Sequence, residues 1–73
     1  MVKVLEIYSD GRVYELDGDL ATQVFLTKNQ VSDLALALEF SQAAEFCLAP
    51  ANKAHPNVVS SRSARRAINQ TGI

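Results

Sequence analysis

The chain has 73 residues, of which 48% are hydrophobic and 21% are charged, and its formal net charge is −1. These values are typical of one soluble globular domain and exclude a second domain. The single cysteine, Cys47, excludes an internal disulfide and argues against a thiolate zinc site, which needs several ligands. A core of this size rarely supplies more than roughly 3–5 kcal/mol, so we expect a partner chain to contribute to stability.

The beginning of the chain predicts neither export nor membrane insertion. Residues 1–8 do not combine a basic region with a following apolar stretch, as a signal peptide does. No apolar run in the sequence approaches the roughly 18 residues that a membrane span requires. We therefore expect a cytoplasmic protein that does not enter a membrane.

The first part of the chain, residues 1–26, predicts a β-meander. Residues 2–8 are rich in β-branched and aromatic side chains and end at a Ser-Asp-Gly turn, and residues 12–16 complete a hairpin. After an Asp-Gly-Asp turn, residues 20–26 alternate as a third antiparallel strand, for which a short helix is the competing prediction. The first strand is apolar on both faces. We therefore expect the C-terminal segment or another copy to cover part of the second face.

Residues 27–48 predict one long helix that packs on this sheet. Thr27 and Gln30 fit a capping box at its start, and Pro50 marks its end. Between them, apolar side chains recur at spacings of three and four residues in two tracks, and residues of high helix propensity dominate. The resulting apolar surface is wider than a three-stranded sheet needs. The helix is therefore also the expected interface with a second copy or another partner.

The rest of the chain is predicted to be a linker and a basic C-terminal segment. Residues 49–57 have the composition of a linker, and residues 58–73 carry a short helical pattern. The predicted fold is therefore a single α+β domain, residues 1–73. It consists of a three-stranded antiparallel sheet, one long helix packed on it, and a short C-terminal helix.

Charge is divided unequally along the chain. Residues 1–45 contain eight acidic and three basic residues, a net of −5, whereas residues 46–73 contain no acidic and four basic residues, a net of +4. Three of the latter are candidates for contact with a polyanion or an acidic partner: Arg62, Arg65 and Arg66. The alternative is that these arginines pair with the chain's own acids. Glu39 and Glu45 are then the first expected partners.

The sequence predicts no catalytic, cofactor or metal site. The segment Asp17-Gly18-Asp19 lacks the further oxygen ligands and the glycine of a calcium loop, and is interpreted as a turn. His55 is the only histidine and has no cysteine or carboxylate at ligand spacing. Cys47 is interpreted as a small buried hydrophobic residue. An enzyme would require His55, Cys47 and a carboxylate to converge in one pocket.

The function predicted from the sequence is that of a small non-enzymatic protein-binding module, a regulator, adaptor or inhibitor that works as a homodimer. Its candidate interface residues come from the predicted helix and the first hairpin: Leu34, Leu36, Leu38, Phe40, Tyr8 and Tyr14. For the two tyrosines, a cross-strand pair in the core is the alternative. The second candidate function is that of a nucleic-acid-binding accessory protein that uses the arginine cluster.

Overall fold

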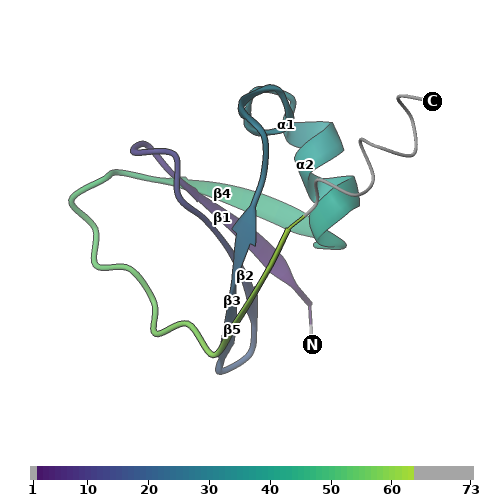
Figure 1. The fold of residues 1–73 in the computed structure, drawn as a ribbon. Helices are drawn as coiled ribbons and strands as arrows, with labels where there is room; N and C mark the ends of the chain where they lie inside the picture. The colour runs from purple at the N-terminus through teal and green to yellow at the C-terminus, as the bar shows by residue number, and fades with distance from the viewer. Residues whose placement is uncertain (1, 64–73) are drawn as a thin grey trace.

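The structure is a computed structural model that describes residues 2–63 as a five-stranded mixed sheet with two short helices (Figure 1). The strand order is β4-β1-β2-β3-β5. The strands are β1 (Val4–Tyr8), β2 (Val13–Asp17), β3 (Leu20–Phe25), β4 (Glu45–Ala49) and β5 (Ser60–Ser63). The helices are α1 (Lys28–Ser32) and α2 (Leu34–Ser41). The predicted fold, a three-stranded antiparallel sheet followed by one long helix, is therefore wrong.

The three central strands form an antiparallel meander, in which β1 pairs with β2 and β2 with β3. Tight turns join them. Gly11 and Gly18 have φ values of 95° and 63°, a backbone conformation that glycine adopts without a steric penalty. In the first turn, the Asp10 carboxylate accepts a hydrogen bond from the backbone N–H of Arg12. Because these turns depend on residues next to them in the sequence, β1, β2 and β3 lie within residues 1–26, where a meander was predicted.

The two outer strands make the sheet mixed. β4 runs parallel to β1 and β5 runs parallel to β3, so each is reached by a crossover and not by a hairpin. The helices form the first crossover, on one face of the sheet, and residues 50–59 form the second (Figure 1). Because β4 and β5 lie at opposite edges, this second connection spans the full width of the sheet.

The predicted helix at residues 27–48 is wrong because its sequence forms two helices and a strand. The capping box at its start is confirmed, since Thr27 and Gln30 exchange both expected hydrogen bonds. Asp33 then adopts an extended conformation, with φ −103° and ψ 95°, and its carboxylate accepts from the N–H of Leu36. It ends α1 and caps α2. Gln42, with φ 63°, ends α2 in a left-handed conformation, and β4 follows.

The predicted C-terminal helix is also wrong where the structure describes it. Ser60–Ser63 is strand β5, in register with residues 22–25 of β3. The remainder of the predicted helix, with Arg65 and Arg66, lies outside the described residues.

The two faces of the sheet have different cores. On the helix face, which α1 and α2 cover, Leu5, Ile7, Val13, Val24 and Ala37 form the buried apolar cluster. On the crossover face, which residues 50–59 cross, Tyr8, Tyr14 and Ala49 form one buried apolar cluster. Both faces are thus covered, and the second by residues that the sequence identified as a linker.

Candidate functional site

A cluster of polar side chains fastens the crossover to its face of the sheet. In the register of the sheet, Glu6 lies between Tyr14 of β2 and Cys47 of β4, and Tyr8 follows on the same face. Lys53 and His55 of the crossover complete this crossover cluster, whose members are Glu6, Tyr8, Tyr14, Cys47, Lys53 and His55.

Hydrogen bonds and ring contacts connect the members of the crossover cluster. Lys53 Nζ donates to Glu6 Oε2 over 2.6 Å, and the Tyr8 hydroxyl lies 2.7 Å from Glu6 Oε1. The same hydroxyl lies 3.0 Å from the Ala54 carbonyl oxygen. The His55 ring stacks on Tyr8 at a centroid distance of 4.2 Å, and its Nδ1 is 2.8 Å from the Tyr14 hydroxyl. The polar groups are therefore directed at one another.

Burial and these hydrogen bonds shift the pKa values of four members of the cluster, and the hydrogen bond to Glu6 raises the pKa of Lys53. Burial raises the pKa of Glu6, but the hydrogen bonds from Lys53 and Tyr8 outweigh it, and the net pKa lies below its ordinary value. Burial, assisted by the hydrogen bond to Glu6, raises the pKa of Tyr8 to about 12. The Cys47 thiol is partly buried where it contacts Glu6, and this partial burial and the Glu6 carboxylate raise its pKa. At neutral pH the cluster therefore holds a carboxylate, a neutral phenol and a neutral thiol.

This arrangement disfavours ionisation of the Cys47 thiol. Cys47 Sγ lies 3.9 Å from Glu6 Oε2, and a carboxylate beside a thiol disfavours the thiolate that would attack a substrate. His55 contacts the two tyrosines, and its Nε2 is 3.6 Å from the Asp10 carboxylate. The three groups that an enzyme would need thus approach one cluster, where each is engaged with a structural partner.

The candidate interface residues occupy two environments. Tyr8 and Tyr14 are buried in the crossover cluster, with ring centroids 5.4 Å apart in an edge-to-face pair. The four candidates on α2 are partly buried: Leu34, Leu36, Leu38 and Phe40. Leu34 and Leu38 pack against the core of the helix face. In this arrangement neither tyrosine offers a contact surface.

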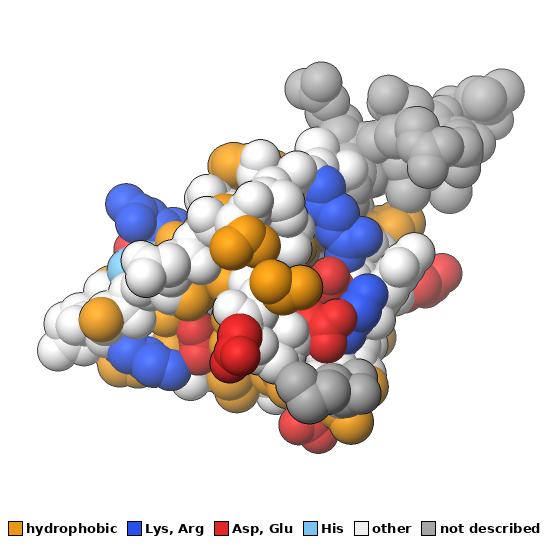
Figure 2. Space-filling model, turned by 90° about the horizontal axis from the view of Figure 1, so that it is seen from below, with side chains coloured by type: hydrophobic (Ala, Val, Ile, Leu, Met, Phe, Trp, Pro, Cys, Tyr) orange, Lys and Arg blue, Asp and Glu red, His pale blue; other side chains and the backbone are white. Residues whose placement is uncertain are grey.

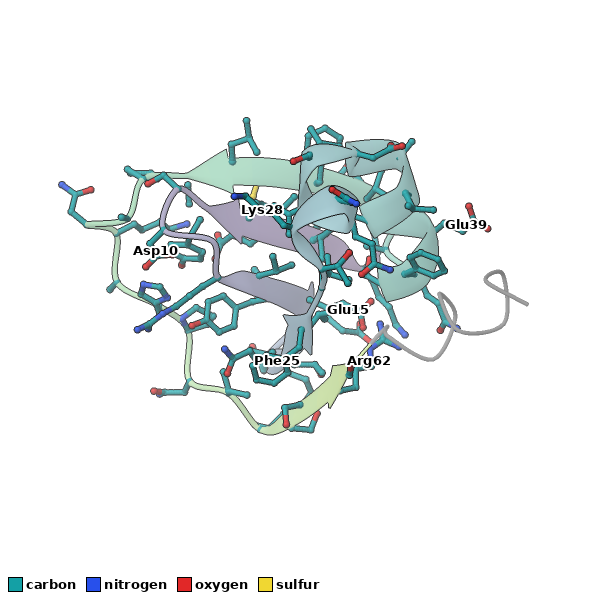
Figure 3. The ribbon with its side chains drawn as sticks, turned by 45° about the horizontal axis from the view of Figure 1, so that its top comes forward. Asp10, Glu15, Phe25, Lys28, Glu39 and Arg62 are labelled. Atoms are coloured by element: carbon teal, nitrogen blue, oxygen red, sulfur yellow. The ribbon has the colours of Figure 1, made fainter. Side chains whose placement is uncertain are left out.

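Arg62 is engaged within the chain. Its Nη2 lies 2.7 Å from Glu15 Oε2 and also donates to the Ser41 carbonyl oxygen. Figure 3 shows Arg62 directed toward Glu15, whereas Glu39 projects outward from α2, away from both. Its observed partner is therefore Glu15, and not Glu39 or Glu45. Figure 2 shows basic side chains beside acidic ones on the face that it displays.

One surface, the outer edge of β4, was not predicted from the sequence. Phe46 and Leu48 lie opposite Leu5 and Ile7 of β1, so they point to the helix face, yet 38% and 69% of their surfaces are exposed. Cys47, between them, is exposed as well. We call this surface the β4 edge, residues 45–49. The alternation of Phe46 and Leu48 with Glu45 and Cys47 was its only local signal, and the prediction of a helix concealed it.

Other kinds of site are not found in the part of the chain that the structure describes. Within residues 2–63, no group of three or more His, Cys, Asp or Glu side chains is arranged to hold a metal ion. The same residues include no helix with the length and apolar character needed to cross a membrane. Comparison with protein-family models, with curated proteins and with solved structures finds no match to this chain.

Proposed function

We propose that this chain is a non-enzymatic protein-binding module whose binding surface is the β4 edge. The observation that carries the proposal is an outer strand whose apolar side chains, Phe46 and Leu48, are exposed at an edge with which no further strand of residues 2–63 pairs. An extended segment of another protein chain can add to such an edge by main-chain hydrogen bonds, and side-chain contacts then supply specificity.

The main-chain geometry of β4 supports this mode of binding. Ser9 N–H donates to the Ala49 carbonyl oxygen, so the polar groups of Ala49 point to β1. Because the direction alternates along a strand, those of Glu45 and Cys47 point the same way. The N–H and C=O groups of Phe46 and Leu48 then point away from the sheet. They form the hydrogen-bonding row that an added strand would use.

The composition of β4 supports it further. Natural sheets protect their edges with lysine, proline, bulges or very short strands, because an open apolar edge recruits other chains. β4 has the sequence EFCLA, which contains no lysine or proline, and Pro50 follows directly after it. The other outer strand, β5, has the polar sequence SSRS. Of the two edges, β4 is therefore the one suited to a protein partner.

The nucleic-acid alternative rests on fewer residues than the sequence suggested. Arg62 forms an ion pair with Glu15 and would have to leave this buried partner in order to contact a phosphate. Arg65 and Arg66 would then carry the binding alone, and two arginines neutralise few phosphates. No shift of DNA or RNA at low salt would exclude this alternative, whereas a shift that weakens steeply with salt would favour it.

Site-specific photo-crosslinking in the host cell tests the proposal. The variant Leu48→p-benzoylphenylalanine places the reactive group on the β4 edge. The control Val59→p-benzoylphenylalanine places it at a site of similar exposure, 62%, beside β3 at the other end of the sheet. We expect a product that contains a second polypeptide from position 48, resistant to nuclease, and little from position 59. The absence of a polypeptide product from position 48 would overturn the proposal.

A further inference from the structure

We propose that the strand that covers the β4 edge is β4 of a second copy of this chain, paired antiparallel about a two-fold axis at Cys47. This inference rests on the proposed function, because it names the partner of the same edge. Two copies that use the same edge must pair antiparallel to form a closed, two-fold symmetric dimer. The dimer would join two five-stranded sheets into one continuous sheet.

The register follows from the direction of the main-chain groups. Only Phe46 and Leu48 direct their N–H and C=O groups outward within β4, so these residues must form the hydrogen-bonded pairs. With the axis at Cys47, Phe46 pairs with Leu48 of the second copy on both sides of the axis. All five residues of each strand, Glu45–Ala49, then have a partner.

If the axis is moved by one residue in either direction, fewer of the outward N–H and C=O groups of β4 find a hydrogen-bond partner in the second copy. With the axis at Leu48, Phe46 would pair with Pro50 of the other copy, which has no N–H to donate. With the axis at Phe46, Leu48 would pair with Ala44, which lies outside the strand. The axis at Cys47 also places Glu45 opposite Ala49, so that the two Glu45 carboxylates are kept apart.

The side chains on the helix face support the same register. Phe46 and Leu48 share this face with the fully buried Leu5 and the buried Ile7, their neighbours in β1. Pairing Phe46 with Leu48 of the second copy places an aromatic ring against an aliphatic side chain, a favourable cross-strand pair. It also extends the two cores of the helix face across the junction. The exposed apolar surface of β4 becomes the centre of an interface.

Cys47 supplies a direct measure of this register. At the axis, the two Cys47 residues form a pair without main-chain hydrogen bonds, with Cα atoms about 4.5 Å apart. That distance lies within the range of roughly 4.4–6.8 Å that disulfides span. Diamide would oxidise the two thiols to one disulfide and be reduced in the process. Because the pKa of Cys47 is raised, the reaction is run at about pH 9 to supply thiolate.

The experiment combines light scattering with diamide crosslinking of the purified protein. We expect a dimer, twice the 8.0 kDa chain mass, at tens of micromolar protein, and efficient crosslinking through Cys47. Two reference variants are Phe46→Cys/Cys47→Ala, which crosslinks best if the axis lies at residue 46, and Val59→Cys/Cys47→Ala, which is remote from the interface. Stronger crosslinking of either reference than of the wild type would overturn the register.

The variant Leu48→Pro tests the pairing by a second route. Proline lacks the N–H that Leu48 directs away from β1, so the hydrogen bonds between β1 and β4 are retained. Proline is tolerated at such edge positions. The control Leu48→Ala truncates the side chain to a similar extent but keeps the N–H. We expect Leu48→Pro to weaken dimerisation by about tenfold or more relative to Leu48→Ala, because each dimer loses two hydrogen bonds. Equal dimerisation, with both variants folded by circular dichroism, would overturn strand pairing.

The outcomes separate this inference from the proposed function. A wild-type monomer at tens of micromolar overturns self-pairing. If position 48 then still photo-crosslinks to a different polypeptide in the cell, the proposed function holds and only the identity of the partner was wrong. If position 48 yields no polypeptide product either, both proposals fail.

Discussion

Arg62 on β5 reaches across β3 to the carboxylate of Glu15 on β2, where its Nη2 lies 2.7 Å from Glu15 Oε2. Both side chains lie on the helix face, and the same guanidinium nitrogen donates to the Ser41 carbonyl oxygen at the end of α2. The Glu15 side chain is only 7% exposed. One arginine thus connects the last described strand, a central strand and the helix layer.

Removing this connection should destabilise the fold. In Arg62→Ala, the buried Glu15 carboxylate loses its charged partner, and we expect the free energy of unfolding to fall by about 1–3 kcal/mol. Urea denaturation monitored by circular dichroism measures the loss. The control is Arg12→Ala, whose side chain is 57% exposed and lies 3.7 Å from Asp10, and which should cost less than about 0.5 kcal/mol. Equal losses in the two variants would contradict a structural role for the Arg62–Glu15 pair.

Local sequence signals located the start of the helical region but not its extent. Thr27 and Gln30 form the capping box that their spacing predicts. Asp33 lies inside the predicted helix, residues 27–48, yet a carboxylate that caps the next turn competes with continued helix. Near the end of the predicted helix, residues 45–49 have no strong β propensity. Their strand depends on pairing with β1, some forty residues earlier, which no local pattern encodes.

The cap at Asp33 gives a prediction about the break between the helices. Asp33→Ala removes the acceptor for Leu36 N–H, and we expect a loss of about 1 kcal/mol in the free energy of unfolding. Asp33→Asn retains a side-chain acceptor and should cost a small fraction of that. Urea denaturation of both variants against the wild type provides the comparison. If Asp33→Ala is as stable as Asp33→Asn, the side-chain acceptor at residue 33 does not stabilise the break between α1 and α2.

The crossover cluster was beyond sequence reasoning for the same physical reason. Lys53 and His55 lie in a stretch with linker composition, and each appeared isolated because its partners are far away along the chain. Lys53 pairs with Glu6 across 47 residues, and His55 with Tyr14 across 41. The apolar character of both faces of β1 did indicate that something covers the second face. Which segment covers it depends on the parallel outer strands, whose positions fix the path of the crossover.

The ion pair between Glu6 and Lys53 predicts a loss of stability in acid. Although burial raises the pKa of Glu6, the hydrogen bonds from Lys53 and Tyr8 lower it overall, so the folded state binds this proton less readily than the unfolded state. The contribution of the carboxylate is therefore fully present above the unfolded pKa of about 4.3 and is lost as pH falls through the lower, folded value. We expect the free energy of unfolding of the wild type to decrease below about pH 4.5 more steeply than that of Glu6→Gln. Parallel acid dependence in the two proteins would show that Glu6 does not contribute.

The buried Tyr8 predicts a loss of stability at alkaline pH. Its pKa rises to about 12 because burial and the hydrogen bond to Glu6 disfavour the phenolate. Since the folded pKa exceeds the unfolded value of about 10, the stabilisation is present below pH 10 and is lost as pH rises toward 12. We expect Tyr8→Phe to be less stable than the wild type near neutral pH but to lose less between about pH 9 and about pH 11, as measured by urea denaturation. Tyr14→Phe is the matched control. Because it keeps Tyr8, its free energy of unfolding should decrease with rising pH as that of the wild type does. If the loss of stability at alkaline pH persists in Tyr8→Phe and disappears in Tyr14→Phe, it arises from Tyr14, and the prediction is contradicted.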